Sequence, residues 1–210
     1  MSQKTRRIFF DLDFTLYDTA ALMENLRNDL ERLGYSRCAI DAGFDQLNDA
    51  GYSLEGHLRL LGHPEGKVQE RANELRFHLS YGTKYLLPGV HDLLCKLRDN
   101  SELHLLTFGY PPYQQAKFAG LEGLASVFAD AHYVWNDGSK GEVIARFDPE
   151  DESWFLDDSL SHLEDVCQKA PWAKVIRVAW PQFKPRLFPG DHIRWDVASS
   201  AEDIAKLLGR

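Results

Sequence analysis

The sequence predicts an α/β protein: a doubly wound, Rossmann-like parallel sheet core with a small all-helical cap domain. The first observation is a series of short apolar runs that end at polar residues and alternate with amphipathic segments, a pattern typical of parallel βα repeats. The second is a break in this alternation between residues 18 and 85, where only helical patterns occur. We therefore expect residues 1–17 and 86–210 to form the α/β core and residues 18–85 to form the helical cap.

Each predicted strand is a short apolar run that stops at a polar, Gly or Pro residue. The first, residues 7–10, ends abruptly at Asp11, as a buried parallel strand does where its carboxyl end meets a site. Similar runs cover residues 103–107, 153–157 and 174–179, and a weaker fifth candidate covers residues 127–134.

Helical patterns fill the segments between these runs. Pro88 opens one whose apolar residues share a face, and Pro in the first turn is a common start signal. Further helices are expected at residues 113–119, 140–147, 159–169 and 200–208, the last of them capped by Ser200.

Within the predicted cap, helical patterns cover residues 22–33 and 44–48. After Pro64 a third pattern appears as a stripe formed by Val68, Ala72, Leu75 and Leu79. Residues 51–53 and 62–66 are the expected connections, and the Pro-rich residues 181–189 are expected to form an irregular surface loop of the core.

The composition is that of a globular chain, with 210 residues of which 44% are hydrophobic. A net charge of -8 without a Lys/Arg cluster argues against a nucleic-acid polymer as partner, because phosphate backbones bind to basic surfaces. The apolar run that ends at Asp11 is too short for a signal peptide or a membrane span, so we expect a cytoplasmic location and no membrane partner. Cys38, Cys95 and Cys167 are widely spaced, which suits buried thiols in a reducing compartment.

Two pairs of carboxylates end apolar runs: Asp11 with Asp13, and Asp157 with Asp158. The carboxyl ends of parallel strands open onto the same edge of a sheet, where ligands bind, so the four acids are expected to converge. Their mutual repulsion would raise their pKa values unless a cation lay between them. Hard oxygen ligands without nearby His or Cys favour Mg²⁺.

Thr107 and Lys140 could bind an anion at the same edge. The Thr107 hydroxyl, at the end of its run, can donate a hydrogen bond to a phosphate oxygen, and Lys140 would add a point charge. We favour Lys140 over Lys117 because it begins a helical pattern after the turn-like residues 136–139, whereas Lys117 lies inside one.

These residues, taken together, resemble the motifs of the haloacid dehalogenase superfamily of phosphohydrolases. Residues 11–16 look like its first motif, and Thr107, Lys140 and the pair Asp157 and Asp158 look like the second, third and fourth motifs, in the family's order. The predicted helical insertion also lies where the small cap domains of the family lie. The resemblance therefore covers nearly the whole chain.

The resemblance implies a magnesium-dependent phosphatase that acts on a small phosphorylated metabolite, a nucleotide or a sugar phosphate being candidates. Asp11 would attack phosphorus to form an aspartyl-phosphate, and Asp13 would act as the general acid and base. Mg²⁺ would be held by the Asp11 side chain, the Asp13 backbone carbonyl and Asp158, with Asp157 as a second acidic member. Lys140 and Thr107 would bind the phosphoryl oxygens.

Two departures from the family pattern stand in the second and third motifs. Phe108 follows Thr107 where many members have a polar residue, and Gly141 follows Lys140 where many have Pro. The acid at Asp13 argues against a dehalogenase, since halide leaves without protonation.

Two alternatives remain open: a phosphosugar mutase, and a non-catalytic binding protein on the same fold. Residues 11–13 and 15–17, together with residues 51–58, also have a short similarity to the pyrimidine nucleotidase branch of the superfamily. Five residues in or beside the cap are candidates for substrate selection: Tyr17, Tyr52, His57, Arg59 and His63.

Overall fold

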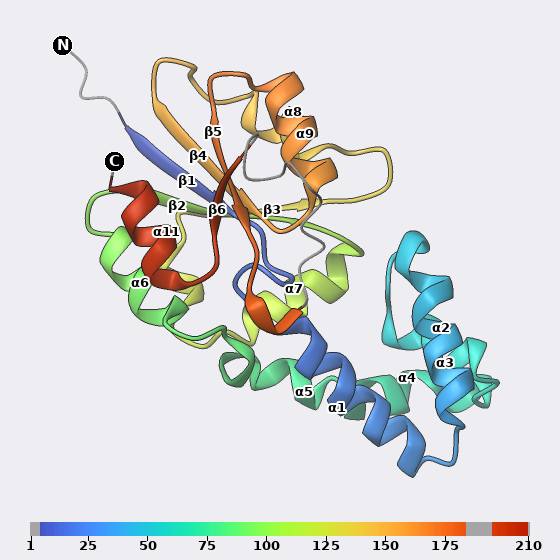
Figure 1. The fold of residues 1–210 in the computed structure, drawn as a ribbon. Coiled ribbons are helices and arrows are strands. Elements are labelled where there is room, and N and C mark those ends of the chain that lie inside the picture. The colour runs from blue at the N-terminus through green and yellow to red at the C-terminus, as the bar shows by residue number, and fades with distance from the viewer. Residues whose placement is uncertain (1–4, 184–194, 210) are drawn as a thin grey trace.

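The computed structural model describes residues 5–183 and 195–209, and within these the side chains of residues 48–50 are not described. Its centre is a sheet of six parallel strands in the order β3-β2-β1-β4-β5-β6 (Figure 1). The strands are β1 (Arg6–Phe10), β2 (Glu102–Phe108), β3 (Asp130–Val134), β4 (Glu152–Asp157), β5 (Lys174–Val178) and β6 (Asp196–Ala198).

The sheet is doubly wound. From β1 the chain proceeds outward through β2 and β3 and then returns to β4 on the other side of β1, so the strand order reverses between β1 and β4. Helices α6 (Val90–Leu97) and α11 (Ala201–Leu208) cover one face, and α8 (Lys140–Ile144) and α9 (Leu160–Lys169) cover the other. This arrangement confirms the predicted fold class.

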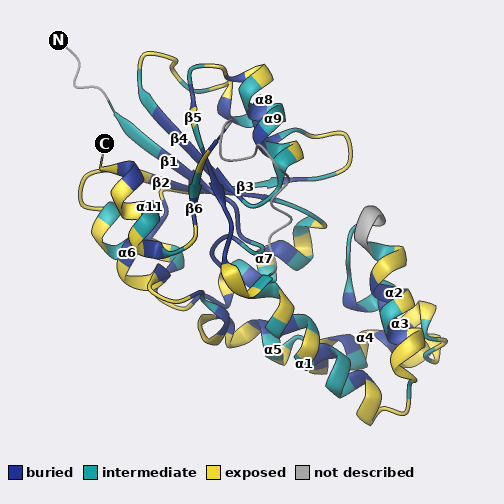
Figure 2. Cartoon of the chain, in the orientation of Figure 1, coloured by how far each residue is buried: buried dark blue, intermediate teal, exposed yellow. Residues whose placement is uncertain are grey.

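Side chains of the central strand β1 belong to two hydrophobic cores. Ile8 and Phe10 belong to one cluster and Phe9 to the other, because successive side chains of a strand point to opposite faces of the sheet. All three are fully buried. Figure 2 shows this burial running through the middle of the sheet, with exposed residues on the outer sides of the helices.

Residues 18–85 are called the helical segment below. It contains α1 (Thr19–Arg32), α2 (Arg37–Ala50), α3 (Leu54–Leu60), α4 (Glu65–Leu75), α5 (Phe77–Ser80) and the 3₁₀ helix η1 (Gly82–Tyr85). The stripe predicted after Pro64 is divided between α4 and α5, and α3 is a helix that the sequence pattern did not predict.

The two ends of the helical segment lie side by side. Tyr17 and Leu86 form an antiparallel bridge. The backbone N–H of Leu87 donates to the carbonyl of Leu16 at 3.0 Å, and the N–H of Asp18 donates to the carbonyl of Tyr85 at 2.6 Å. The chain therefore leaves the core and returns to it at one place, beside the carboxyl end of β1.

The five predicted strands are present, and the structure adds β6, which is only three residues long. In the weaker candidate, Val127 ends the 3₁₀ helix η2 (Ala125–Val127), and the strand itself begins at Asp130. Of the Pro-rich stretch 181–189, residues 181–183 form the 3₁₀ helix η3 (Pro181–Phe183), and residues 184–189 lie outside the described residues.

The expectation of buried thiols is wrong. Cys38 is exposed on α2, and Cys95 and Cys167 are only partly buried. None of the three forms a disulfide among the described residues. Among the described residues, no helix has the length and apolar character needed to span a membrane.

Candidate active site

The candidate site lies at the carboxyl ends of three neighbouring strands. Asp11 directly follows the central strand β1, Thr107 lies at the end of β2, and Asp157 is the last residue of β4. Because β1 pairs with both β2 and β4 in parallel register, these ends meet on one edge of the sheet. The edge also adjoins the reversal point of the strand order.

Lys140 joins two of the acids. Its Nζ donates to Asp11 Oδ1 at 2.5 Å and to Asp157 Oδ2 at 2.6 Å, and all three side chains are almost completely buried. Burial alone would lower the pKa of Lys140, but the charges of Asp11 and Asp157 raise it above its usual value. The lysine is therefore a fixed positive charge at the centre of the site.

Asp165 on α9 holds the start of α8 in place and so presents Lys140. Its Oδ2 accepts from the Ser139 hydroxyl at 2.6 Å and from the N–H of Gly141 at 2.8 Å. A Cβ on Gly141 would lie 2.6 Å from the Asp165 carbonyl oxygen, which shows how closely α8 and α9 approach. Gly141 thus permits a contact that a larger residue would block.

Asp11, Asp157 and Asp158 can each offer one carboxylate oxygen to a common point, since these atoms lie within 4.8 Å of one another. Burial raises the pKa of Asp11 to about 7 against the opposing effect of Lys140. Burial and the charges of Asp157 and Asp11 raise the pKa of Asp158 to about 8. The single ammonium of Lys140 therefore does not neutralise all three carboxylates.

Asp157 differs from Asp158 in its contacts. Besides Lys140, it accepts a hydrogen bond from the N–H of Ser159 at 2.7 Å, and Nδ1 of His162 lies 3.1 Å from its Oδ2. Burial would raise the pKa of Asp157, but Lys140 and His162 hold it below the usual value. Asp157 is fully buried, whereas Asp158 is only partly buried and is the more accessible of the pair.

The Asp13 carboxylate is held apart from this cluster. Lys117 and Thr19 both donate to its Oδ1, and Nε2 of Gln114 donates to its Oδ2 at 2.9 Å. Burial would raise the pKa of Asp13, but Lys117 and the other two donors hold it below the usual value. The next residue, Phe14, has a positive φ of 58°, a strained conformation for a residue other than glycine.

Thr107 is completely buried, and its hydroxyl oxygen has no hydrogen-bond partner within the part of the chain that the structure describes. A buried hydroxyl without a partner costs about 1–3 kcal/mol, so such groups usually serve a ligand or water. Its place at the end of β2, beside β1, suits a group bound at Asp11. The hydroxyl of Thr15, which is also completely buried, has no partner either.

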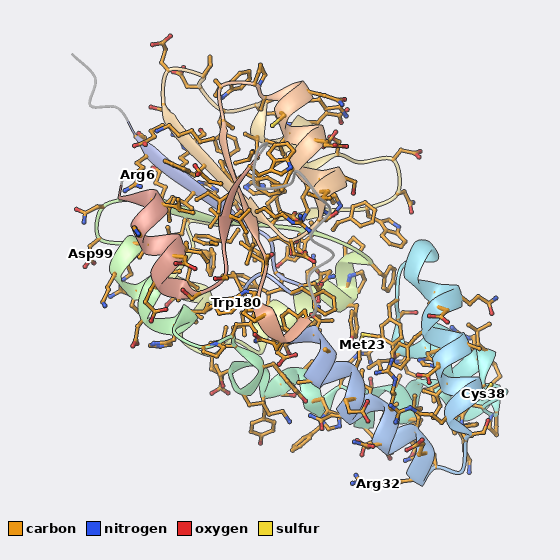
Figure 3. All side chains as sticks on the ribbon, viewed as in Figure 1. Arg6, Met23, Arg32, Cys38, Asp99 and Trp180 are labelled. Carbon is orange, nitrogen blue, oxygen red and sulfur yellow. The ribbon has the colours of Figure 1, made fainter. Side chains whose placement is uncertain are left out.

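A cavity of about 240 Å³ opens on the Asp13 side of the site. Asp13, Gln114 and Lys117 lie in its wall, together with residues of the core and of the helical segment. Met23 on α1, labelled in Figure 3, is one of the latter. This space is called the interdomain cavity below.

The structure brings Asp11, Lys140, Asp157 and Asp158 into one cluster, with Thr107 on the adjoining strand. Asp13 reaches the same edge, but its side chain turns towards α7 (Pro111–Ala119).

Sequence reasoning missed the partners of Asp13, and Lys117 belongs to the site although it lies inside a helix. Gln114 and Lys117 are three residues apart on one helical face, directly after the strand of Thr107, and that spacing is the signal that could have identified them.

Of the five candidates for substrate selection, Tyr52 is the one that lines the interdomain cavity. His57 is buried behind it, Arg59 pairs with Glu65 at 3.0 Å on the surface, and His63 Nδ1 lies 2.6 Å from the hydroxyl of Tyr35. Tyr17 is buried in the core. These four are not part of the cavity wall.

No protein-family model matches the chain, and no curated protein matches it. Solved structures do resemble it over almost its whole length. The magnesium-bound hydrolase YfnB of Bacillus subtilis has a TM-score of 0.63 and 16% identity, covering 99% of this chain and 100% of its own.

Two other similar structures are described as enzymes that catalyse different reactions. A Thermotoga maritima protein described as a β-phosphoglucomutase has a TM-score of 0.67 and 18% identity over 98% of this chain and 99% of its own. The L-2-haloacid dehalogenase of Xanthobacter autotrophicus has a TM-score of 0.62 and 14% identity over 97% of this chain and 98% of its own. At these identities the comparison concerns architecture: the chain has the fold of the haloacid dehalogenase-like hydrolases.

Proposed function

We propose that the protein is a magnesium-dependent phosphatase that hydrolyses a small phosphate monoester through an aspartyl-phosphate on Asp11. The observation that carries the proposal is the cluster around Asp11: a buried carboxylate at the end of the central strand, one ammonium on it and two more carboxylates within reach. Phosphoryl transfer requires such a nucleophile together with concentrated positive charge. The partner that this site implies is a small phosphorylated metabolite, not a nucleic-acid polymer.

Mg²⁺ fits this donor set. The available ligands are carboxylate oxygens, which hard divalent cations prefer. The raised pKa values of Asp11 and Asp158 indicate a surplus of negative charge that a cation would neutralise. The Bacillus subtilis protein of the same fold was solved with magnesium bound, which supports this choice of metal.

We assign the metal ligands as the Asp11 side chain, the Asp13 backbone carbonyl and Asp158. Asp157 is assigned a supporting role outside the ligand set, because its carboxylate oxygens already contact Lys140, Ser159 and His162. When bound, the ion supplies positive charge that offsets the repulsion between the nucleophile and the anionic ester.

Asp11 forms a bond to phosphorus as the bond from phosphorus to the ester oxygen breaks. Lys140 fixes the Asp11 carboxylate through Oδ1 and favours its ionised form. The Thr107 hydroxyl, which has no other partner among the described residues, donates to a phosphoryl oxygen. Water then attacks the aspartyl-phosphate, which releases inorganic phosphate and restores Asp11.

Asp13 moves the protons of both steps. It gives a proton to the departing ester oxygen and takes one from the attacking water. Its pKa, held low by Lys117, suits the second role directly. For the first role the carboxylate must be protonated as substrate binds, which requires it to give up part of its contact with Lys117.

We propose that the helical segment is the cap of this site. Two observations support that role: Tyr52 of the segment contacts Tyr113 of the core with ring centroids 5.0 Å apart, and the segment supplies part of the wall of the interdomain cavity. Its adjacent ends beside β1 would allow it to move as one body and exclude water on closing.

A screen for phosphate release tests the proposal. Nucleotides, sugar phosphates and small phosphorylated acids are incubated with and without Mg²⁺, and at least one class is expected to release phosphate only when Mg²⁺ is present. EDTA should abolish this release and excess Mg²⁺ should restore it. A metal-independent rate would contradict the proposal, and inactivity over the whole panel would favour a binding protein on this fold.

The phosphoglucomutase of the same fold makes a mutase the second candidate. Product analysis separates the two reactions, because hydrolysis yields free phosphate whereas a mutase yields an isomerised sugar phosphate. The dehalogenase of the same fold shows that the architecture alone does not choose the reaction. Asp13, held two residues after the nucleophile, favours an oxygen leaving group, since that group needs a proton.

Magnesium is also expected to stabilise the fold in a pH-dependent way. In the metal-free protein, unfolded Asp11 and Asp158 lose their protons near pH 4, while the folded state keeps them until about pH 7 and 8. Their contribution to stability is therefore lost as pH rises from about 4 to about 8. Mg²⁺ binds the ionised carboxylates, so it should raise Tm more at pH 8 than at pH 6.

At a hundredfold excess of Mg²⁺ over Kd, the increase at pH 8 should be roughly 5–10 °C by thermal unfolding. Asp158→Asn should remove most of this increase. The exposed Asp99, on the surface turn after α6 (Figure 3), provides the matched control, and Asp99→Asn should respond to Mg²⁺ as the parent does. An equal response of both variants would remove Asp158 from the ligand set.

A further inference from the structure

The wall of the interdomain cavity is mainly aromatic. Half of its lining residues carry aromatic rings, and they come from both parts of the chain. These rings include Phe44, Tyr52, Tyr110, Tyr113 and Trp135. At about 240 Å³ the cavity is small for a ligand site and has room for one ring system with a short tether.

The rings contact one another across the boundary between the helical segment and the core. Tyr52 of the segment lies edge-to-face with Tyr113 of α7, with centroids 5.0 Å apart, and stacks on Phe44 at 5.2 Å. On the core side, Trp135 lies edge-to-face with Tyr110 at 5.9 Å. The walls therefore offer both faces and edges, the two geometries in which a further aromatic ring gains energy beyond its buried area.

The backbone of the helical segment closes the cavity against Trp135. Gly51 has a φ of 84°, and a Cβ added to it would lie 1.5 Å from Cη2 of the Trp135 ring. This close approach requires glycine for both steric and conformational reasons. The Trp135 ring is therefore held between the core and the segment, at the edge of the cavity.

The Tyr52 hydroxyl is directed away from the cavity. It lies 3.1 Å from His57 Nδ1, while His57 Nε2 lies 3.0 Å from the carbonyl of Ile40. Because the carbonyl can only accept, Nε2 carries the proton, and Nδ1 must accept from the Tyr52 hydroxyl. Tyr52 thus contributes its ring to the cavity, while its hydroxyl is hydrogen-bonded within the helical segment.

The charged groups of the wall are already paired, whereas Oε1 of Gln114 is a buried acceptor that has no hydrogen-bond partner among the described residues. Lys117 and Gln114 both donate to Asp13 at one end of the cavity. A polyhydroxylated leaving group would place several hydroxyls against aromatic walls with few partners, at a cost for each unpaired group. A flat ring has no such cost.

We propose that the interdomain cavity binds an aromatic ring of the leaving group, so that the substrate is the phosphate monoester of an alcohol that carries a planar ring. The inference rests on the proposed function for the place of the phosphoryl group. The ester oxygen lies at Asp13, which both carries the proton for it and lines the cavity. The ring then extends outward between Tyr52, Tyr113 and Trp135.

A pair of matched esters tests the inference. Benzyl phosphate and cyclohexylmethyl phosphate have leaving groups of nearly equal size, but only the first is aromatic and flat. With Mg²⁺ present, kcat/KM for the benzyl ester should exceed that for the cyclohexylmethyl ester about tenfold. Glucose 6-phosphate should be a poorer substrate than either.

Trp135→Leu and Phe44→Leu should each reduce the ratio of kcat/KM for the benzyl ester to kcat/KM for the cyclohexylmethyl ester. Phe77→Leu is the control, because Phe77 is an aromatic residue of α5 that is 58% exposed and lies outside the cavity wall. It should keep the full preference.

Binding of the non-hydrolysable benzylphosphonate and cyclohexylmethylphosphonate, measured by calorimetry with Mg²⁺, separates this inference from the proposed function. Tighter binding of the benzyl compound that is weakened by Trp135→Leu supports the ring site. This holds even if no ester releases phosphate, because the lack of release would overturn only the proposed phosphatase activity. Equal binding of the two compounds, or equal kcat/KM of the two esters, overturns the ring site and leaves the phosphatase standing.

Discussion

Replacement of Asp11 by Asn is expected to lower the rate of phosphate release by about four orders of magnitude or more, because an amide oxygen cannot form the aspartyl-phosphate. The fold should remain intact. Asn has nearly the same shape, and its side-chain oxygen can still accept from Lys140, which now bonds the Asp11 carboxylate at 2.5 Å. Initial rates with saturating substrate and Mg²⁺, together with the circular dichroism spectrum, measure both parts of the expectation.

The trapped intermediate makes this test specific. With a labelled phosphate ester and an acid quench, the parent protein should carry a phosphoryl label that hydroxylamine removes, and Asp11→Asn should carry none. Asp99→Asn makes the same chemical change on the surface and should retain full activity and labelling. A variant at residue 11 that kept one tenth of the parent activity would show that another group attacks phosphorus.

Lys140→Met is expected to destabilise the protein by about 3–5 kcal/mol at pH 7 and to abolish phosphate release. The substitution removes the only ammonium that bonds both Asp11 and Asp157 within the described residues, and it leaves those two carboxylates buried beside each other. Their pKa values would then rise, so the loss of stability should be smaller at pH 5, where protonation removes the repulsion. Urea unfolding at the two pH values measures the difference.

Lys174→Met is the matched control for this loss. Lys174 also pairs with a carboxylate, Glu152 at 3.0 Å, but its side chain is 55% exposed. Exposed pairs contribute about 1 kcal/mol or less, so this variant should unfold close to the parent. If both methionine variants lost the same stability, burial of the Lys140 pair would not be the source of its effect.

The sequence predicted the architecture because the parallel strands are buried on both faces and read as apolar runs. Residues 7–10 and 153–157 have this form, and their carboxyl ends meet as expected. β6 escaped prediction because three residues are too few to produce a periodic signal. α3 escaped because its seven residues provide barely two turns of a helical pattern.

The site was only partly predictable for a different reason. Asp11, Asp157 and Asp158 follow from strand ends, whereas the contacts of Asp13 depend on how α7 packs against β2 and β3. A buried lysine within a helix has the same local sequence as a solvated one, so apart from its spacing from Gln114 it is the tertiary contact with Asp13 that distinguishes Lys117. The aromatic wall of the interdomain cavity likewise gathers rings from distant parts of the chain, such as Phe44 and Trp135.

The position of β1 at the middle of the sheet has a consequence for how the chain folds. β1 is the first strand in sequence, yet Arg7 pairs with Glu102 on one side and with Ser153 on the other. β1 therefore pairs only with strands far along the chain, which gives a high contact order and slow folding. The helices of residues 18–85 need mainly local contacts and can form earlier, so synthesis from the N-terminus delivers the apolar β1 well before it can be covered.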